Sequence, residues 1–198
     1  MASSVAPRNI VLVGVGALGS HVLLLARNWG VTIKVIDFDR VEQKNVASQF
    51  HTKMSLGRNK AQACQQAMLG MYGLKIEAVP HKLTDQNSEQ LLKGADLVID
   101  CTDNVAAREV IQTHVKKTGI PCLHGSVSAE GDFARVVWTE HFKPDAEGVE
   151  GQATCEDGVQ LPFFCLASSY IAQEAQRFLK GGTKRSFMVT PMAVLRIA

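Results

Sequence analysis

Three glycines near the start of the chain have the spacing of a phosphate-binding turn. Gly14, Gly16 and Gly19 follow an apolar run that begins at Ile10, and a second apolar run continues to Trp29. In a strand-turn-helix unit, the first glycine permits a tight turn and the second lets a phosphate approach the backbone. The third lets the helix pack closely on the sheet, and the N–H groups at the helix start face the phosphates. The pattern therefore predicts a nucleotide-binding unit.

An acidic residue after the next apolar segment supports this interpretation. Asp37 follows the segment 31–36, near the offset of about 20 residues at which an acidic side chain reaches a ribose hydroxyl. An aspartate there favours a free 2′-hydroxyl over a 2′-phosphate. The glycines alone would also suit an ordinary turn, and NAD is the default nucleotide for such a motif. The turn therefore does not identify the nucleotide.

More polar side chains follow the predicted strand ends: Asp37, Asp39, Asn45, Gln49, Lys60, the segment 100–104 and Arg108. The carboxyl ends of parallel strands form the ligand crevice of such a sheet. Lys60 can neutralise phosphate charge, and Asp103 can offer hard oxygen ligands to Mg²⁺. This set suits a nucleoside triphosphate better than a nicotinamide, and little chain remains for the substrate domain of an oxidoreductase.

The predicted elements place these side chains at one edge of a sheet. We expect strands near 10–13, 31–37, 74–79, 95–100 and 121–124, and helices from Gly19 to Trp29 and over 59–69, 88–92 and 105–117. This alternation predicts a Rossmann-like α/β fold, a mainly parallel sheet with helices on both faces. Beyond Gly131 we expect a small α+β extension, with a strand at 134–139, a long loop at 142–161, a helix from Pro162 to Leu179 and one or two strands within 187–197. The prediction is one domain over residues 1–198, with a nucleotide-binding half at 1–130 and the extension at 131–198.

Composition excludes several classes of function. The chain has 198 residues, 46% of them hydrophobic and 20% charged, with a formal net charge of +2, and its basic residues are scattered. We therefore expect no nucleic-acid surface. No apolar run approaches the roughly 20 residues that span a bilayer, and the first eight residues lack signal-peptide features, so we expect no membrane association and a cytoplasmic location. The odd number of cysteines, without a Cys-x-x-Cys pair, argues against a disulfide framework and a four-cysteine zinc site.

Four motifs together resemble the ThiF/MoeB/ubiquitin-activating-enzyme adenylation domain. They are the glycine turn, Asp-Phe-Asp at 37–39 with Asn45 eight residues after Asp37, Gly-x-x-Lys ending at Lys60, and Asp-Cys-Thr-Asp-Asn-Val-Ala-x-Arg over 100–108. The resemblance continues through Thr-Cys-Glu-Asp-Gly-Val-x-x-Pro over 154–162 and through the helix at 167–179. It therefore covers almost the whole chain.

The resemblance implies an ATP-dependent enzyme that adenylates the C-terminal glycine carboxylate of a small ubiquitin-like or sulfur-carrier protein ending in Gly-Gly. By position in the motifs, Asp37 would hold the ribose, Asn45 and Lys60 the phosphates, and Asp103 the Mg²⁺ ion. The remaining residues of the nucleotide site would be Gly14, Gly16, Gly19, Asp39, Gln49, Asn104 and Arg108. The family also implies a homodimer, a carrier-binding and crossover-loop role for residues 131–198, and transfer to a downstream conjugating or sulfur-transfer enzyme.

Three departures from the family pattern are visible. Ser48 stands where the pattern Asn-x-x-Arg-Gln has an arginine near the β- and γ-phosphates, with Arg58 or an arginine of a partner subunit as candidate substitutes. Only Arg8 precedes the first strand in place of an N-terminal helical extension, and no Cys-x-x-Cys pairs are present, so we expect no zinc. The loss at Ser48 leaves a second hypothesis, a non-catalytic nucleotide-binding sensor or scaffold. An NAD-dependent oxidoreductase is a third.

Cys155 is the cysteine with a candidate catalytic role. It lies in the long loop beside Glu156 and Asp157. In the family that the chain resembles, this loop crosses the adenylate and can carry a cysteine that accepts the acyl group as a thioester or a persulfide-linked species. Nearby negative charge disfavours the thiolate, so an inert loop cysteine is the alternative. The other cysteines, Cys64, Cys101, Cys122 and Cys165, are expected to be packing residues.

The six histidines have no spacing typical of a metal site. We expect His21 to face solvent in the first turn of its helix. His124 is the one histidine placed to line the crevice, because it ends a predicted strand.

Overall fold

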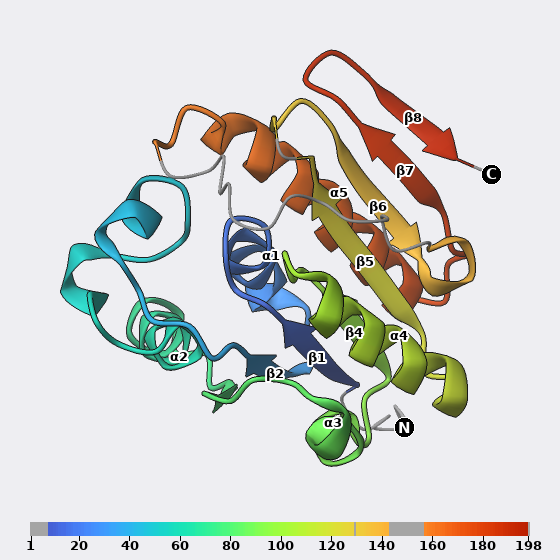
Figure 1. Ribbon diagram of the computed structural model, residues 1–198, viewed down its shortest axis with the longest axis horizontal. Helices are drawn as coiled ribbons and strands as arrows, with labels where there is room; N and C mark the ends of the chain where they lie inside the picture. Colours follow the sequence, from blue (N-terminus) through green and yellow to red (C-terminus); the bar gives the residue numbers. More distant parts are fainter. Residues whose placement is uncertain (1–7, 129, 143–156, 198) are drawn as a thin grey trace, which may run out of the picture.

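The computed structural model describes residues 8–128, 130–142 and 157–197, and it contains an eight-stranded sheet in the order β3-β2-β1-β4-β5-β6-β7-β8 (Figure 1). The first five strands in the chain run parallel: β1 (Asn9–Val13), β2 (Thr32–Ile36), β3 (Glu77–Val79), β4 (Leu97–Asp100) and β5 (Cys122–Val127). The last three pair antiparallel: β6 (Ala134–Trp138), β7 (Ser186–Val189) and β8 (Val194–Ile197). The predicted Rossmann-like α/β class is confirmed.

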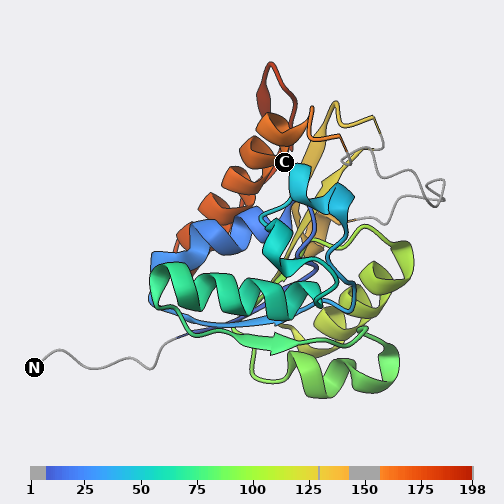
Figure 2. The ribbon, with the colours of Figure 1, turned by 90° about the vertical axis from the view of Figure 1, so that its left-hand side faces the viewer.

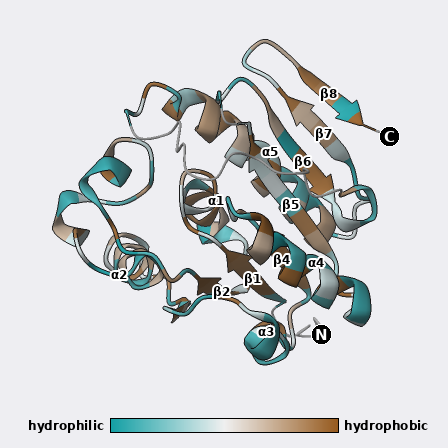
Figure 3. Ribbon diagram, viewed as in Figure 1, coloured by the Kyte–Doolittle hydropathy of each residue, from teal (hydrophilic) through white to brown (hydrophobic). Residues whose placement is uncertain are grey.

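Helices cover both faces of the sheet, as Figure 2 shows. The main helices are α1 (Gly19–Leu25), α2 (Lys60–Tyr72), α3 (Asp85–Leu92), α4 (Val105–Thr118) and α5 (Leu161–Leu179), and the short 3₁₀ helices are η1 (Ala26–Asn28), η2 (Gln43–Ala47), η3 (Lys53–Ser55) and η4 (Thr139–His141). One apolar core contains residues of α1, α2 and α5, and a second contains residues of α3 and α4. All four residues of β4 are buried, a pattern typical of a parallel strand covered on both faces. The neighbouring parallel strands β1 and β2 are brown, that is hydrophobic, in Figure 3.

The strand order places a topological switch point at the carboxyl edge of the sheet, the position of the ligand crevice in open α/β folds. From β1 the chain moves outward through β2 to β3 and then returns to β4 on the other side of β1. Connections therefore diverge between β1 and β4, which is where open α/β sheets bind ligands. Val13 at the end of β1 pairs with Ile36 of β2 and with Asp100 of β4, so these three strand ends lie at one level.

Some boundaries differ from the sequence-based expectations. Helix α3 begins at Asp85 rather than at residue 88, because Thr84 and Asn87 form a capping box. Strand β3 contains only Glu77–Val79. Strand β5 continues to Val127, because β6 pairs with it antiparallel along that length. The closing segment forms two strands, β7 and β8, which extend the same sheet. Within the described ranges, the helices are too short or too polar to cross a membrane.

Candidate functional site

The glycine turn between β1 and α1 forms the floor of the crevice. Gly14 has a φ of +82°, and a Cβ atom there would lie 2.8 Å from the Cys101 carbonyl oxygen. A Cβ at Gly19 would lie 1.9 Å from the Gly14 carbonyl oxygen. Internal packing therefore explains both of these glycines. A Cβ at Gly16 would meet nothing closer than the Gln49 side-chain nitrogen, at 4.0 Å, so the protein itself leaves this position open.

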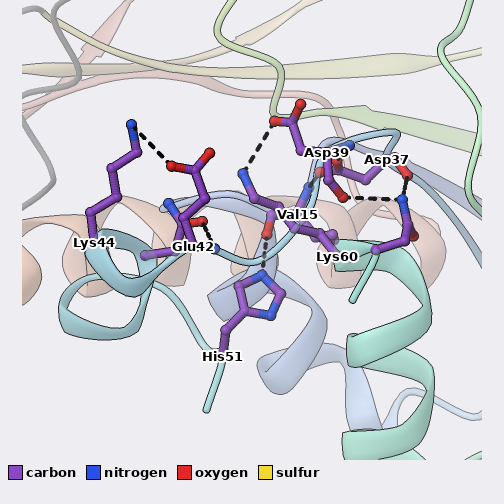
Figure 4. A network of polar contacts seen from close by, with 9 residues as sticks. Val15, Asp37, Asp39, Glu42, Lys44, His51 and Lys60 are labelled. Carbon is purple, nitrogen blue, oxygen red and sulfur yellow. Dashed lines mark hydrogen bonds and ion pairs between the residues drawn. The ribbon is translucent and has the colours of Figure 1, made fainter. Parts of the chain in front are cut away.

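Two side chains hold the backbone of this turn at Val15. The Val15 N–H donates to Asp37 Oδ2 at 2.8 Å, and His51 Nε2 donates to the Val15 carbonyl oxygen at 3.0 Å (Figure 4). Burial raises the pKa of Asp37, while hydrogen bonds from the Val15 and Asp39 N–H groups and the charge of Lys60 oppose that rise. Burial lowers the pKa of His51 to about 4. His51 is therefore neutral at pH 7.

The start of α2 brings a positive charge to the same strand end. The side chain of the N-cap residue Asn59 accepts a hydrogen bond from the Gln62 N–H and donates to the carbonyl oxygen of Asp37 at 2.8 Å. The next residue, Lys60, places its ammonium group 3.2 Å from Asp39 Oδ2. The Lys60 side chain is 10% exposed and that of Asp39 is 48% exposed. Lys60 is thus held at this strand end by an ion pair with Asp39, whose carboxylate is also exposed to solvent.

The segment around η2 covers the turn with polar groups. Asn45 is buried, and its side-chain oxygen accepts from the Glu42 N–H at 2.9 Å, so it caps η2. The Ser48 hydroxyl and the Gln49 side-chain oxygen are buried, and neither has a hydrogen-bond partner in the described part of the chain. An unmade hydrogen bond of this kind costs about 1–3 kcal/mol, so the segment 48–49 holds two unsatisfied polar atoms beside the glycine turn.

His21 lies beneath this segment, and the expectation that it faces solvent is wrong. It is partly buried, because α1 packs under residues 48–51, and its Nε2 donates to the Ser48 carbonyl oxygen at 3.1 Å. Burial lowers its pKa. Arg58 donates to Gln66 on the exposed side of α2, so its described contact does not bring it to Ser48.

The segment after β4 forms the opposite wall. Thr102 lies next to the glycine turn, since a Cβ at Gly14 would be 3.1 Å from its backbone nitrogen. The Asn104 side chain caps α4 by accepting from the Ala107 N–H at 2.8 Å. Arg108 donates to the Thr102 carbonyl oxygen through Nε and a terminal nitrogen, at 3.1 and 2.6 Å. Asp103 is exposed, and its side chain has no hydrogen bond or ion pair with any described residue.

The structure therefore brings most of the predicted site together at one edge. Asp37, Asp39 and Lys60 form one network with the glycine turn, and Gln49 lies beside Gly16. Asn45, Asn104 and Arg108 are close to the crevice, but their described hydrogen bonds go to the backbone. Cys155 lies outside the described residues. His51 is a site residue that the sequence reasoning missed, because nothing in its spacing marks it.

His124 and the four described cysteines are buried or partly buried. His124 reaches this edge of the sheet but is buried there, at 2% exposure, so it does not line open space. Cys64, Cys101 and Cys122 are buried as expected, Cys165 is partly buried, and burial raises the pKa of each thiol. Among the residues described, no cluster of three or more His, Cys, Asp or Glu side chains could hold a metal ion.

Comparisons with known proteins agree with this architecture. A family model described as the ThiF family matches residues 4–194. "Probable adenylyltransferase/sulfurtransferase MoeZ" of Mycobacterium tuberculosis is 29% identical over 188 residues, which cover 87% of this chain and 47% of MoeZ. The sulfur carrier protein adenylyltransferase of Thermus thermophilus is 33% identical over 123 residues, which cover 60% of this chain and 45% of that protein. The chain thus spans less than half the length of both relatives.

A solved structure shows the same fold at lower identity. The E. coli MccB structure with MccA-N7isoASN superposes with a TM-score of 0.79 and 15% identity, covering 96% of this chain and 64% of MccB.

Proposed function

Because this chain belongs to the ThiF family, we propose that it is an ATP-dependent adenylyltransferase whose nucleotide lies over the glycine turn. The observation that carries this proposal is the open position at Gly16. Packing accounts for Gly14 and Gly19, whereas the missing Cβ at Gly16 leaves open space at the turn that a ligand could occupy. The backbone there is already held on both sides of Val15, so little reorganisation would accompany phosphate binding.

The proposed substrate is the C-terminal glycine carboxylate of a small ubiquitin-like or sulfur-carrier protein ending in Gly-Gly. A carboxylate oxygen forms a bond to the α-phosphorus, the bond to the bridging oxygen breaks, and pyrophosphate leaves with that oxygen's electron pair. The product is an acyl-adenylate. The relative from Thermus thermophilus, named a sulfur carrier protein adenylyltransferase, supports this class of substrate. Positive charge and fixed donors favour such a displacement, because both reactants are anions.

The contacts support separate roles for the residues at the crevice. Asp37 would accept hydrogen bonds from the ribose with the lone pairs that its backbone partners leave unused. Lys60, steadied by Asp39, would neutralise phosphate charge, with Asn45 and Gln49 supplying donors beside it. Asn104 and Arg108 would brace the wall that presents Asp103.

The donor set at Asp103 fits Mg²⁺ in the manner of nucleotide sites. Mg²⁺ is usually held there by one or two carboxylates, substrate phosphates and water rather than by a protein cage. Asp103 offers one exposed carboxylate without a side-chain partner among the described residues. Bound there, the ion would supply charge neutralisation at the phosphates.

We extend the proposal to Cys155 as acceptor of the acyl group, in a thioester formed by attack of its thiolate on the acyl carbon with release of AMP. Cys155 lies outside the described residues, so this proposal is supported by the sequence motif that contains it. Cys155→Ala should leave adenylation intact and stop only thioester formation. Thioester formation that survives the substitution would exclude this cysteine.

Three wider proposals follow from family membership. We propose that residues 1–198 act as one adenylation domain, with 131–198 binding the carrier, that the protein is a homodimer, and that a conjugating or sulfur-transfer enzyme receives its product. The four free cysteines among the described residues suit a reducing, ATP-containing compartment such as the cytoplasm.

The test is ATP–pyrophosphate exchange with Mg²⁺ and a carrier protein ending in Gly-Gly. Exchange should depend on the carrier, should vanish when its last glycine is removed, and should fall at least a hundredfold in Asp103→Ala. Exchange that is unchanged in Asp103→Ala would refute the assignment of the site.

A second candidate function is favoured by Ser48. This serine replaces the arginine of the family pattern, and its buried hydroxyl has no described partner. Tight ATP binding without exchange, for carriers that relatives do activate, would establish a nucleotide-binding sensor or scaffold instead.

A further inference from the structure

A buried carboxylate–imidazole pair lies between two neighbouring strands below the crevice. Asp100 at the end of β4 pairs in register with His124 of β5. Oδ2 of Asp100 is 2.8 Å from Nδ1 of His124, and the two side chains are 1% and 2% exposed. Burying two ionisable groups costs desolvation free energy. We therefore looked to the contacts of this pair for its role.

The pair does not have the geometry of a nucleophile-activating site. His124 Nε2 lies 3.2 Å from the Thr139 hydroxyl, so carboxylate, imidazole and hydroxyl follow one another as in a hydrolase triad. That hydroxyl, however, donates to the Cys122 carbonyl oxygen at 3.2 Å. Phe142 also stacks on the imidazole with ring centroids 3.9 Å apart and an interplanar angle of 8°. The Thr139 hydroxyl is thus already engaged as a donor, and one face of the imidazole is covered by a ring.

The contacts of Asp100 lead instead to the wall of the crevice. Its Oδ1 accepts from the Thr102 N–H at 2.9 Å and from the Thr102 hydroxyl at 2.7 Å. The Thr102 carbonyl oxygen is in turn held by Arg108. Asp103 follows directly, and Asn104 on its other side is anchored as the cap of α4. The backbone on both sides of Asp103 is thus immobilised while its own carboxylate remains exposed.

His124 supports the charge on which these contacts depend. Complete burial alone would raise the pKa of Asp100, but the hydrogen bond and charge of His124 and the charge of Arg108 lower it overall. Asp100 is therefore an ionised acceptor, and its two hydrogen bonds from Thr102 are charge-assisted.

We propose that His124 is a positioning residue for Asp103: its hydrogen bond to Asp100 holds the 101–104 loop in the conformation that presents the Asp103 carboxylate to a nucleotide-bound divalent cation. This inference rests on the proposed function, since it takes Asp103 to be the cation ligand. It adds a residue outside the glycine, lysine and strand-end motifs.

Two nearly isosteric variants separate this role from simple core packing. Asparagine places its amide nitrogen near the position of Nδ1, facing Asp100, whereas glutamine reaches the position of Nε2, facing Thr139. We expect His124→Asn to bind Mn²⁺ in the presence of saturating ATP within about threefold of wild type, measured by electron paramagnetic resonance of free Mn²⁺. His124→Gln should bind Mn²⁺ at least tenfold more weakly, with unchanged affinity for ATP in the absence of divalent cations. Equal Mn²⁺ affinity in wild type and His124→Gln would overturn the inference.

A second pair of variants leaves the buried pair intact and covers the case in which His124 substitutions fail to fold. Thr102→Val removes one of the two hydrogen bonds to Asp100 and should weaken Mn²⁺ binding, whereas Thr102→Ser should retain it. Unchanged Mn²⁺ affinity in Thr102→Val would refute the proposed path. Glu174→Gln, on α5 with Arg177 and Arg185 as its partners, serves as a destabilised control with normal Mn²⁺ affinity.

The outcomes distinguish this inference from the proposed function. Absence of pyrophosphate exchange in the wild type with carriers that relatives activate, together with normal Mn²⁺ and ATP binding, refutes adenylation but leaves the positioning role standing. Normal exchange in the wild type, with equal Mn²⁺ affinity across all variants, refutes only the positioning role.

Discussion

The imidazole of His51 donates a hydrogen bond to the carbonyl oxygen of Val15, 3.0 Å away, and so supports the glycine turn from beneath. Asp37 accepts from the N–H of the same residue. Val15 is therefore held at both of its backbone polar groups. The next residue is Gly16, where the space for a Cβ atom is open. The turn is preorganised by two side chains that come from outside the glycine motif.

The free energy of unfolding should depend on pH through His51. Its pKa is about 4 in the folded protein, against about 6.5 for an unperturbed histidine. Between these values the unfolded chain binds more protons, so stability is complete above pH 6.5 and falls as the pH drops toward 4. A difference of 2.5 units corresponds to at most about 3 kcal/mol. Urea unfolding at several pH values should show this loss.

The control for this prediction is His51→Gln, which keeps a donor near Nε2 and does not titrate. Its stability should fall less steeply across the same range. Parallel curves for the two proteins would show that His51 is not the group responsible.

Alanine substitutions at Gly14 and Gly16 should have opposite effects. Gly16→Ala adds a methyl group into open space, so its melting temperature should stay close to that of wild type while its affinity for ATP falls at least tenfold. Gly14→Ala forces a side chain into a positive φ and against the Cys101 carbonyl oxygen, and should cost more than about 1 kcal/mol. Calorimetric ATP titration and thermal unfolding would measure both. Normal ATP affinity in Gly16→Ala would place the nucleotide elsewhere.

Lys60→Met should remove charge while retaining the buried stem of the side chain. We expect ATP affinity to fall about tenfold and exchange to fall about a hundredfold, because the phosphates lose their nearest cation. Asp39→Asn is the matched variant: it removes the 3.2 Å ion pair but keeps the ammonium group, so exchange should fall only a few-fold. Equal losses of exchange in the two variants would mean that exchange depends on the ion pair rather than on the ammonium charge.

Glu174→Gln should lower the free energy of unfolding by about 2 kcal/mol. Glu174 is fully buried on α5 and accepts from Arg185 at 2.6 Å and from Arg177 at 3.2 Å. Both arginines are about 30% exposed and can be partly rehydrated, which keeps the loss below the full cost of a broken buried pair. Glu140→Gln breaks an ion pair with Lys184 in which the carboxylate side chain is 54% exposed, and should change stability by less than about 1 kcal/mol. Chemical denaturation would measure both, and similar losses would contradict the role of burial.

Local patterns in the sequence account for the fold class. Continuous apolar runs, glycine turns and amphipathic segments predict alternating strands and helices, and this alternation requires a mainly parallel sheet. The boundaries that differ have non-local causes. Strand β5 extends to Val127 because Ala134 of β6 pairs with it, a contact that no local window contains.

The candidate site divides in the same way. The glycine spacing, Asp37, Lys60 and the 100–108 motif could be found from sequence, because each follows a predicted strand or begins a predicted helix and strand ends meet at one edge. The hydrogen bond from His51 to Val15 joins residues 36 positions apart, and the pair of Asp100 and His124 joins residues 24 apart. Periodicity carries no information about such pairs.

The sequence by itself therefore determined the α/β class, the glycine turn and the set of polar side chains at the strand ends, because residue type and spacing act through short-range backbone geometry. Only the tertiary structure decided that packing requires Gly14 and Gly19 but not Gly16, that His21 contacts Ser48 while His51 contacts the turn, and that Asp100 is buried against His124. These facts depend on which atoms remain near one another after the sheet and helices pack, and that is a property of the folded chain as a whole.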